Sequence, residues 1–368
     1  MRFGLLQECE TPPGTTHHRR YHEVMDEAVW AEDNGFDFWG TSEQHFLVHF
    51  STVSAPETFY PAVAMRTKRL RLRHMVVLLP FPFNHPIRVA ERAATLDIVS
   101  NGRVELGTGR ANTLLQIDGF QVPIDETRAR WEEGLEIVVK AFLHDPFSHE
   151  GRYFKIPPRS LTPKGVQQPH PPLFMVVQST ESHEVAGRKG LGAISWDMYM
   201  GREYWRDCIA AYRQGMRAGT PISELVTNSI GMTALHAAIA ETTDEAVAIG
   251  GPSTLGFAGW VIEELYPALG KRSSTYAYTL SLEKLRSHAH DLDWLRKQTP
   301  SIILGDPDYW VARLKEYAEM GADEVIIRLD GQPHASIMKQ IELLGKYVIP
   351  KFKTPRSVVG PMVGGGAP

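Results

Sequence analysis

Residues 34–39 read Asn34-Gly35-Phe36-Asp37-Phe38-Trp39, a helical pattern that stops at glycine and passes at once into an apolar strand. The same junction recurs at residues 101–106, 189–194 and 320–325. Glycine takes the left-handed conformation that closes a helix, so a short loop can then lead directly into a buried parallel strand. Four such junctions in one chain predict a repeated β–α unit rather than separate domains.

Hydrophobic periodicity between the junctions extends this pattern along the chain. Tyr21, Val24, Met25, Ala28 and Val29 form one apolar stripe at helical spacing. The predicted strands are 2–8, 36–41, 70–79, 103–108, 173–178, 192–198, 225–233 and 324–329, and the predicted helices are 18–34, 55–67, 86–100, 125–143, 181–189, 202–218, 236–249, 307–320 and 334–350. Eight strands alternating with helices favour an α/β fold of the (β/α)8 TIM-barrel type with insertions. A doubly wound open sheet is the alternative, but it leaves the final strand–helix pair unexplained.

Two segments do not follow the repeat. Residues 144–172 contain a hairpin-like stretch and then a proline-rich run, and residues 250–300 contain Gly250-Gly251-Pro252 and a polar, aromatic middle. Inserts of this size in a compact domain are usually lids or mobile segments. We therefore expect residues 1–368 to form a single barrel domain, with the 250–300 insert as a lid.

Composition excludes several functional classes. The chain has 368 residues, with 39 Lys and Arg against 43 Asp and Glu, and a formal net charge of −4. Without basic runs or acidic tails, nucleic acid and anionic membranes are not expected as main partners. The two cysteines, Cys9 and Cys208, cannot make a disulfide framework or a four-thiolate metal site. The chain opens as a short strand and has no long apolar run, so we expect a cytoplasmic protein.

The active site of a (β/α)8 barrel lies at the carboxyl ends of its strands. The residues at these positions are Glu8 and Cys9, Glu43 to His45, Leu78 to Phe83, Gly109 and Arg110, Gln178 to Ser182, Ser195 to Met198, and Arg328 with Asp330. They include no close carboxylate pair and no defensible Ser-His-Asp order. His45 and His49 are four residues apart, but the apolar residues between them indicate an extended loop, so no metal site is expected. The chemistry is better assigned to a bound organic cofactor.

A hydroxyl-rich turn supports that view. Gln178-Ser179-Thr180-Glu181-Ser182-His183 leads straight into a helix, and its hydroxyls either cap that helix or, with the helix dipole, hold a phosphate. These two readings stay open. Gly107-Thr108-Gly109-Arg110 follows the fourth strand, where small residues permit close approach and Arg110 can pair with phosphate or an electron-rich ring. It lacks the third glycine of a dinucleotide fingerprint.

At these residues the chain resembles the bacterial luciferase superfamily of flavin-dependent monooxygenases, and it is similar to the luciferase α subunit over nearly its whole length. Each matching piece is short, but their order and spacing make the assignment specific. The matching pieces are Gly35-Phe36-Asp37, Glu43-Gln44-His45-Phe46, Lys68-Arg69-Leu70, Leu79-Pro80, His85-Pro86, Leu96-Asp97, Gly102-Arg103, Gly107 with Arg110, Gln178-Ser179, Gly190-Leu191, Ile194-Ser195-Trp196 and Gly305-Asp306-Pro307.

The resemblance implies roles for individual residues. Ser179 and Ser182 match hydroxyls that hold the flavin phosphate, and Arg110 matches an arginine beside it. Met75 and Val76 match a pair joined by a cis peptide under the flavin ring, a bond that costs about 3–4 kcal/mol without proline. Gln178 and Trp196 lie in matching pieces and complete the expected cofactor site.

The expected catalytic residues are Glu43, Gln44 and His45. Glu43 matches a position near the flavin, and His45 is kept. The family's catalytic histidine falls at Gln44, whose amide cannot act as a base near neutral pH, and its reactive cysteine falls at Gly109. Light emission from an aldehyde is therefore not expected, whereas oxygen transfer is still allowed.

The resemblance implies the oxygenase component of a two-component system. Reduced FMN, supplied as co-substrate by a separate NAD(P)H:flavin reductase, would react with O2 to a flavin hydroperoxide and transfer one oxygen to the substrate. The residues predicted to lie around the mouth are mostly aromatic and favour a hydrophobic small molecule as the substrate; they are Phe46, Phe50, Phe59, Phe81, Phe83, Trp196, Met198 and Tyr199. The resemblance also implies a homodimer through the second and third barrel helices. Two alternatives remain open: a deazaflavin-dependent hydride-transfer oxidoreductase, and a non-catalytic flavin-binding protein.

Overall fold

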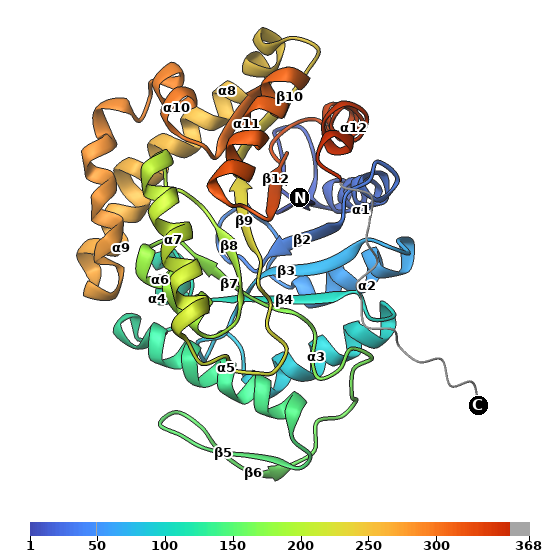
Figure 1. The fold of residues 1–368 in the computed structure, drawn as a ribbon, viewed down its shortest axis with the longest axis vertical. Coiled ribbons are helices and arrows are strands. Elements are labelled where there is room, and N and C mark those ends of the chain that lie inside the picture. The colour runs from blue at the N-terminus through green and yellow to red at the C-terminus, as the bar shows by residue number, and fades with distance from the viewer. Residues whose placement is uncertain (49, 354–368) are drawn as a thin grey trace.

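A computed structural model describes residues 1–48 and 50–353 of the chain. Eight parallel strands close into a barrel in the order β1-β12-β9-β8-β7-β4-β3-β2, which confirms the predicted (β/α)8 fold (Figure 1). The barrel strands are β1 (Arg2–Leu6), β2 (Phe38–Ser42), β3 (Arg71–Leu78), β4 (Val104–Gly109), β7 (Leu173–Val177), β8 (Gly192–Ser195), β9 (Ile230–Ala234) and β12 (Glu324–Arg328). Each predicted strand overlaps one of these, although the strand predicted at 225–233 begins only at Ile230.

Helices surround the barrel on its outer side. They are α1 (His17–Asp33), α2 (Pro56–Arg66), α3 (Pro86–Val99), α5 (Thr127–Leu143), α6 (Thr180–Arg188), α7 (Arg202–Ala218), α11 (Pro307–Met320) and α12 (His334–Leu343), with the short α4 (Leu114–Gly119) after β4. The final helix passes into a π-helical turn at Leu344–Val348 and a 3₁₀ turn at Ile349–Lys351. The four junction glycines, Gly35, Gly102, Gly190 and Gly321, have φ of +86°, +75°, +72° and +98°, so each takes the left-handed conformation expected of it.

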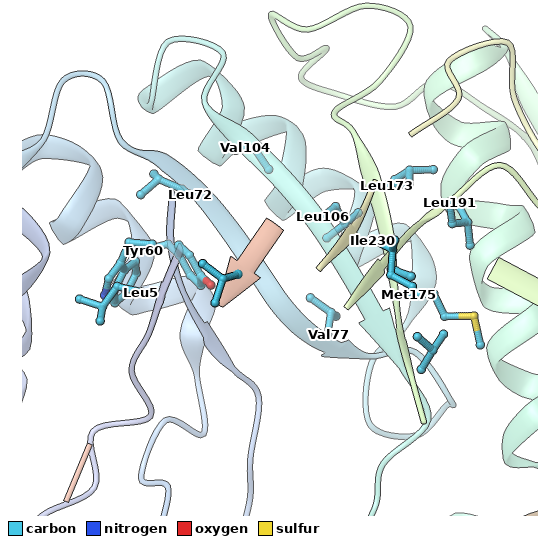
Figure 2. Packing of buried hydrophobic residues seen from close by; sticks show 14 of the residues in the cluster. Leu5, Tyr60, Leu72, Val77, Val104, Leu106, Leu173, Met175, Leu191 and Ile230 are labelled. Carbon is cyan, nitrogen blue, oxygen red and sulfur yellow. The ribbon is translucent and has the colours of Figure 1, made fainter. Parts of the chain in front are cut away.

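Apolar side chains fill the space between the barrel and its helices. Leu5, Leu72, Val104 and Leu106 on the strands are buried there, and Figure 2 shows them among their neighbours. Parallel strands that are covered on both faces have nearly continuous runs of apolar residues, and these runs allowed the strands to be predicted from the sequence.

Charged groups occupy the barrel interior near the amino ends of the strands. The guanidinium of Arg73 is fully buried and contacts the carboxylates of Glu105 at 2.6 Å and Glu324 at 2.5 Å. Its Cζ atom also lies 3.7 Å from the ring centre of Phe38 and 3.8 Å from that of Phe174. Ion pairs and two aromatic faces therefore satisfy a charge that burial alone would make costly.

The insert at 144–172 contains the expected hairpin. Strands β5 (Phe147–Glu150) and β6 (Lys155–Arg159) pair in antiparallel fashion, and the hairpin extends away from the barrel beyond α5 (Figure 1). The remaining residues of this insert lead back into the barrel at β7.

The predictions for residues 236–300 need correction. Residues His236–Ile239, predicted to begin a helix, form strand β10, which pairs in parallel with β11 (Ile302–Gly305), a strand that was not predicted. The helix α8 starts at Thr243 and continues to Trp260, through the segment expected to be a loop. It is followed by a π-helical turn at Val261–Leu265, α9 (Tyr266–Arg272), a 3₁₀ segment at Ser274–His288 and α10 (Leu292–Gln298). Short apolar runs do not distinguish a strand from a helix by periodicity, which explains the first error.

Within residues 1–48 and 50–353, none of the helices combines the length and apolar character needed to cross a bilayer.

Candidate active site at the carboxyl ends of the strands

Two cavities adjoin each other at the carboxyl ends of the barrel strands. The first, here called the Arg110 cavity, has a volume of about 840 Å³ including its open mouth and lies beside Arg110, Ser179 and Ser182. The second, here called the Trp260 cavity, has about 880 Å³ on the same measure and lies beside Phe50, Trp196 and Trp260. Their shared wall consists of Gln44, Val76, Asn112, Val176 and Gln178.

Nine of the ten predicted site residues line these cavities. Glu43, Arg110, Ser179 and Ser182 line the Arg110 cavity, Met75 and Trp196 line the Trp260 cavity, and Gln44, Val76 and Gln178 line both. The structure therefore brings together residues from β2, β3, β4, β7 and β8 that are separated by up to about 150 positions in the sequence. His45 is the exception, since it lines neither cavity.

Glu43 is held by a complete set of hydrogen bonds. Its buried carboxylate accepts from the Leu78 backbone N–H at 2.9 Å and from the Asn84 amide at 3.0 Å. His45 Nε2 lies 3.1 Å from the same carboxylate, and the His45 ring packs against Phe120 with 4.6 Å between ring centres. His45 thus contacts Glu43 rather than the cavity, and this geometry suits a residue that positions its neighbour.

Gln44 faces both cavities. Its side-chain oxygen accepts a hydrogen bond from the amide of Gln116 on α4, and its backbone N–H donates to the Val53 carbonyl at 3.0 Å. An amide has no proton-accepting nitrogen near neutral pH, so Gln44 can orient a ligand but cannot serve as a general base.

The hydroxyl turn after β7 forms a reciprocal cap on α6. The Ser179 hydroxyl accepts from the Ser182 N–H at 3.2 Å, and the Ser182 hydroxyl accepts from the Ser179 N–H at 3.0 Å. Both residues also line the Arg110 cavity, so the capping role and the ligand-binding role are compatible in one structure. Behind the turn, burial lowers the pKa of His183 to about 4, and this histidine is therefore neutral near pH 7.

Arg110 has an unused hydrogen-bond donor. Within the described part of the chain its buried Nη1 atom has no hydrogen-bond partner, and its Cζ atom lies 4.6 Å from the ring centre of Tyr276. The other arginine of this cavity, Arg128, is already paired with Glu181 at 3.0 Å. A buried donor without a partner costs free energy, and an anionic group bound beside Arg110 would remove that cost. The residues present therefore fit the phosphate of a flavin.

The segment expected to lie under the flavin ring differs from the prediction in one respect. The cis peptide bonds of the described residues all precede prolines, at Pro82, Pro146, Pro163 and Pro169, and the Met75–Val76 bond is trans. The irregularity there is instead a change of register between β3 and both neighbouring strands, near His74 to Val77. A trans bond avoids the cost of a cis non-proline peptide, and the bulge still exposes Val76 to both cavities.

The insert supplies site residues that the sequence analysis did not identify. The Gln178 side chain donates to the Tyr266 hydroxyl at 2.7 Å and accepts from the Tyr278 hydroxyl at 3.1 Å. Phe257 and Trp260 at the end of α8 form part of the Trp260 cavity. Residues of the insert therefore line both cavities, and the aromatic residues of its middle were the available signal.

Most of the residues predicted to lie around the mouth pack elsewhere. Phe50 and Trp196 line the Trp260 cavity, whereas Met198 and Tyr199 are buried beside it and Phe46 is largely exposed. The Trp196 indole donates to the Ser301 hydroxyl at 3.1 Å, which joins the end of β8 to the segment that follows the insert.

His49, considered above with His45 as a pair of ligands, lies outside the described residues. The described residues contain no group of three or more His, Cys, Asp or Glu side chains arranged to hold a metal ion.

Comparison with known proteins gives consistent similarities. A family model described as luciferase-like monooxygenase matches residues 1–324. The oxygenase component of a flavin-dependent trigonelline monooxygenase from Acinetobacter baylyi is 24% identical over 363 residues, which cover 96% of each chain. An F420-dependent glucose-6-phosphate dehydrogenase from Amycolatopsis mediterranei is 25% identical over 337 residues, covering 90% of this chain and 94% of that protein. Among solved structures, the monooxygenase RslO1 from Streptomyces bottropensis superposes with a TM-score of 0.76 at 25% identity, covering 96% of this chain and 100% of the other.

Proposed function

Because the chain belongs to the luciferase-like monooxygenase family, we propose that it is the oxygenase component of a two-component monooxygenase that uses reduced FMN and O2. The observation that carries this proposal is the unpaired Nη1 atom of Arg110, which is buried beside the hydroxyl turn of α6. A phosphate there would gain a guanidinium, two hydroxyls and the positive end of a helix dipole.

Different residues of the Arg110 cavity would bind different parts of the flavin. Arg110, Ser179 and Ser182 hold the phosphate, and Gln178, fixed by two tyrosines of the insert, orients the bound group between the two cavities. Val76 lines both cavities, and Met75 lines the Trp260 cavity beside it. Reduced flavin, when bound, supplies the electrons that activate O2 for transfer of one oxygen atom to the substrate.

Glu43 and Gln44 follow β2 and lie next to the carboxyl end of β3. Glu43 holds the Leu78 backbone in place and is itself oriented by His45, while Gln44 presents its amide to both cavities. The aromatic and aliphatic residues of the Trp260 cavity would limit the access of water to the reacting atoms and so protect a reactive intermediate from decay. The substrate is a hydrophobic small molecule that enters this second cavity.

A separate reductase would supply the reduced flavin. Residues 107–112 place Asn112 where a dinucleotide fingerprint has its third glycine, so this chain offers no nicotinamide site at that turn. The similar protein from Acinetobacter baylyi is an oxygenase component, which supports the proposal that reductase and oxygenase are separate proteins here too.

A second candidate keeps the fold and changes the cofactor. The similarity to an F420-dependent dehydrogenase over 90% of the chain favours deazaflavin-dependent hydride transfer. We expect the protein to bind reduced FMN at least about tenfold more tightly than the reduced deazaflavin coenzyme in anaerobic titrations, a difference of about 1.4 kcal/mol. Tighter binding of the reduced deazaflavin coenzyme would favour deazaflavin-dependent hydride transfer instead. Tight FMN binding without any substrate-dependent use of oxygen would favour a flavin-binding protein instead.

We further propose that the protein is a homodimer joined through α2 and α3. Near the carboxyl ends of these helices the side chains of Met65, Ile98 and Val99 are 75%, 44% and 42% exposed, an arrangement that a dimer interface would cover. Sedimentation equilibrium at micromolar protein should give the dimer mass, and the double variant Met65→Glu/Ile98→Glu should give a monomer. A wild-type monomer at that concentration would contradict this assignment.

A further inference from the structure

Glu8 brings a carboxyl group to the wall of a cavity whose other lining residues are uncharged. Among the described residues that line the Trp260 cavity, Glu8 is the one acidic side chain, and no lysine or arginine lines it. Glu8 follows β1 and its backbone N–H donates to the carboxylate of Asp330, which follows β12. The carboxyl group therefore has a defined position at the carboxyl end of the barrel, in the cavity assigned above to the substrate.

The arginine beside Glu8 is shared with other carboxylates. Arg328 Nε lies 3.3 Å from Glu8, but its Nη2 atom contacts Glu10 more closely, at 2.6 Å, and its Nε atom is 3.9 Å from Asp330. Arg328 does not itself line the cavity, but its Cζ atom lies 6.0 Å from the ring centre of Phe257, which does. Glu8, in contrast, lines the cavity directly.

The surrounding charges leave a negative excess. Arg20 pairs with Glu27 at 2.6 Å and with Asp330 at 3.3 Å, and His334 lies 2.7 Å from Glu27. The carboxyl groups of this cluster are Glu8, Glu10, Glu23, Glu27 and Asp330, and its guanidinium groups are Arg19, Arg20 and Arg328. With every carboxyl group ionised, five acidic groups against three arginines give a formal charge of −2, or −1 when His334 is protonated. A cation bound at Glu8 would balance the remaining charge.

Aromatic rings form the walls near this carboxyl group. Phe50 stacks on Trp260 with ring centres 4.8 Å apart and an angle of 10°, and Phe257 meets Phe50 edge-on at 5.2 Å. Trp196 and Tyr266 add two further rings to the lining. Aromatic faces are electron-rich and attract cations, most strongly when water is excluded, and flat rings stack on them.

We propose that the Trp260 cavity binds a flat ring substrate that carries a positively charged nitrogen, with the Glu8 carboxylate as the residue that determines this specificity. The assignment rests on the proposed oxygenase function for the statement that the ligand is a substrate. The charge preference of the cavity does not depend on flavin. Burial raises the pKa of Glu8 in the empty cavity, and a bound cation favours the ionised form, so ligand and carboxylate stabilise each other.

The test uses the flavin-free protein and three ring compounds of similar size and different charge: the N-methylquinolinium cation, neutral 1-methylnaphthalene and the 1-naphthoate anion. Isothermal titration calorimetry should show the cation binding about tenfold more tightly than the neutral ring, with the anion weakest. Because this comparison requires no variant, it stands whether or not any substitution folds. Equal binding of the cation and the neutral ring by the wild-type protein would overturn the proposal.

Substitutions test whether Glu8 is the residue that causes the preference for the cation over the neutral ring. Glu8→Gln should bind the cation and the neutral ring within about twofold of each other, while its affinity for the neutral ring stays that of the wild type. Glu8→Asp, which keeps the charge, should retain most of the preference. Glu203→Gln on α7 removes the same formal charge at a side chain that is 83% exposed, and it should change nothing. A tenfold preference that persists in Glu8→Gln would overturn the role of Glu8. Failure of FMN to bind in a separate titration would count against the proposed function and not against this result.

Discussion

Replacing Arg110 with methionine should weaken the binding of reduced FMN about 30-fold, which corresponds to about 2 kcal/mol for one charge-assisted hydrogen bond to phosphate. Methionine keeps an unbranched apolar stem and lacks the guanidinium. The same variant should be at least as stable as the wild type without flavin, because the wild-type protein buries an unpaired Nη1 atom that methionine lacks. Anaerobic fluorescence titration and thermal unfolding measure the two effects.

Two controls isolate the phosphate. Riboflavin lacks that group, so its affinity should be the same in the wild type and in Arg110→Met. Arg128→Met should have a smaller effect on FMN, since Arg128 is already paired with Glu181. An FMN affinity within about twofold of the wild type in Arg110→Met would show that the phosphate binds elsewhere.

Replacing Arg73 with methionine should lower the free energy of unfolding by about 3–5 kcal/mol, because two buried carboxylates lose their closest buried cation. The variant also leaves the aromatic faces of Phe38 and Phe174 without the charge between them. Urea unfolding followed by circular dichroism gives the value. Arg88→Met is the matched control, since Arg88 pairs with Glu91 on an exposed helix surface, and it should cost less than about 1 kcal/mol. Equal effects of the two substitutions would contradict this account of the barrel interior.

The cluster around Arg73 makes the free energy of unfolding depend on pH in the acidic range. Burial alone would raise the pKa of Glu105, but Arg2, Arg73 and Arg71 outweigh it and hold that pKa far below its ordinary value. A carboxyl group whose pKa is lower in the folded state stabilises the protein above its unfolded pKa of about 4.3 and loses this contribution as the pH falls. The wild type should therefore lose stability steadily below about pH 4, and Arg73→Met should lose less over the same range.

The sequence predicted the barrel because its signals were local. A left-handed glycine such as Gly321 marks the end of a helix, and the buried strand that follows is a continuous apolar run. The part of α8 beyond residue 249 was missed because Gly250-Gly251-Pro252 is typical of a loop. In the structure these small residues allow close packing: a Cβ atom at Gly250 would lie 2.5 Å from Leu304 on β11. That reason depends on a strand far along the chain, so local patterns could not reveal it.

The site residues that follow barrel strands could be predicted from the sequence, whereas those on the insert could not. Arg110, Ser179 and Ser182 follow strands, and a barrel brings all strand ends to one face. Tyr266 and Tyr278 belong to the insert, whose path over the barrel mouth depends on long-range packing. The resemblance to a family led to the expectation of a cis bond at Met75–Val76, where the structure has a trans bond and a bulge.

The activity proposed for this chain is the transfer of oxygen from O2 with reduced FMN supplied by another protein. The direct measurement is the incorporation of oxygen-18 from labelled O2, using a separate NAD(P)H:flavin reductase and a panel of hydrophobic ketones, aldehydes and terpenes together with N-alkylated ring cations. We predict that one labelled oxygen atom enters the product, and only when the reductase is present to supply reduced FMN. Product formed equally well under nitrogen, without label, would contradict the account.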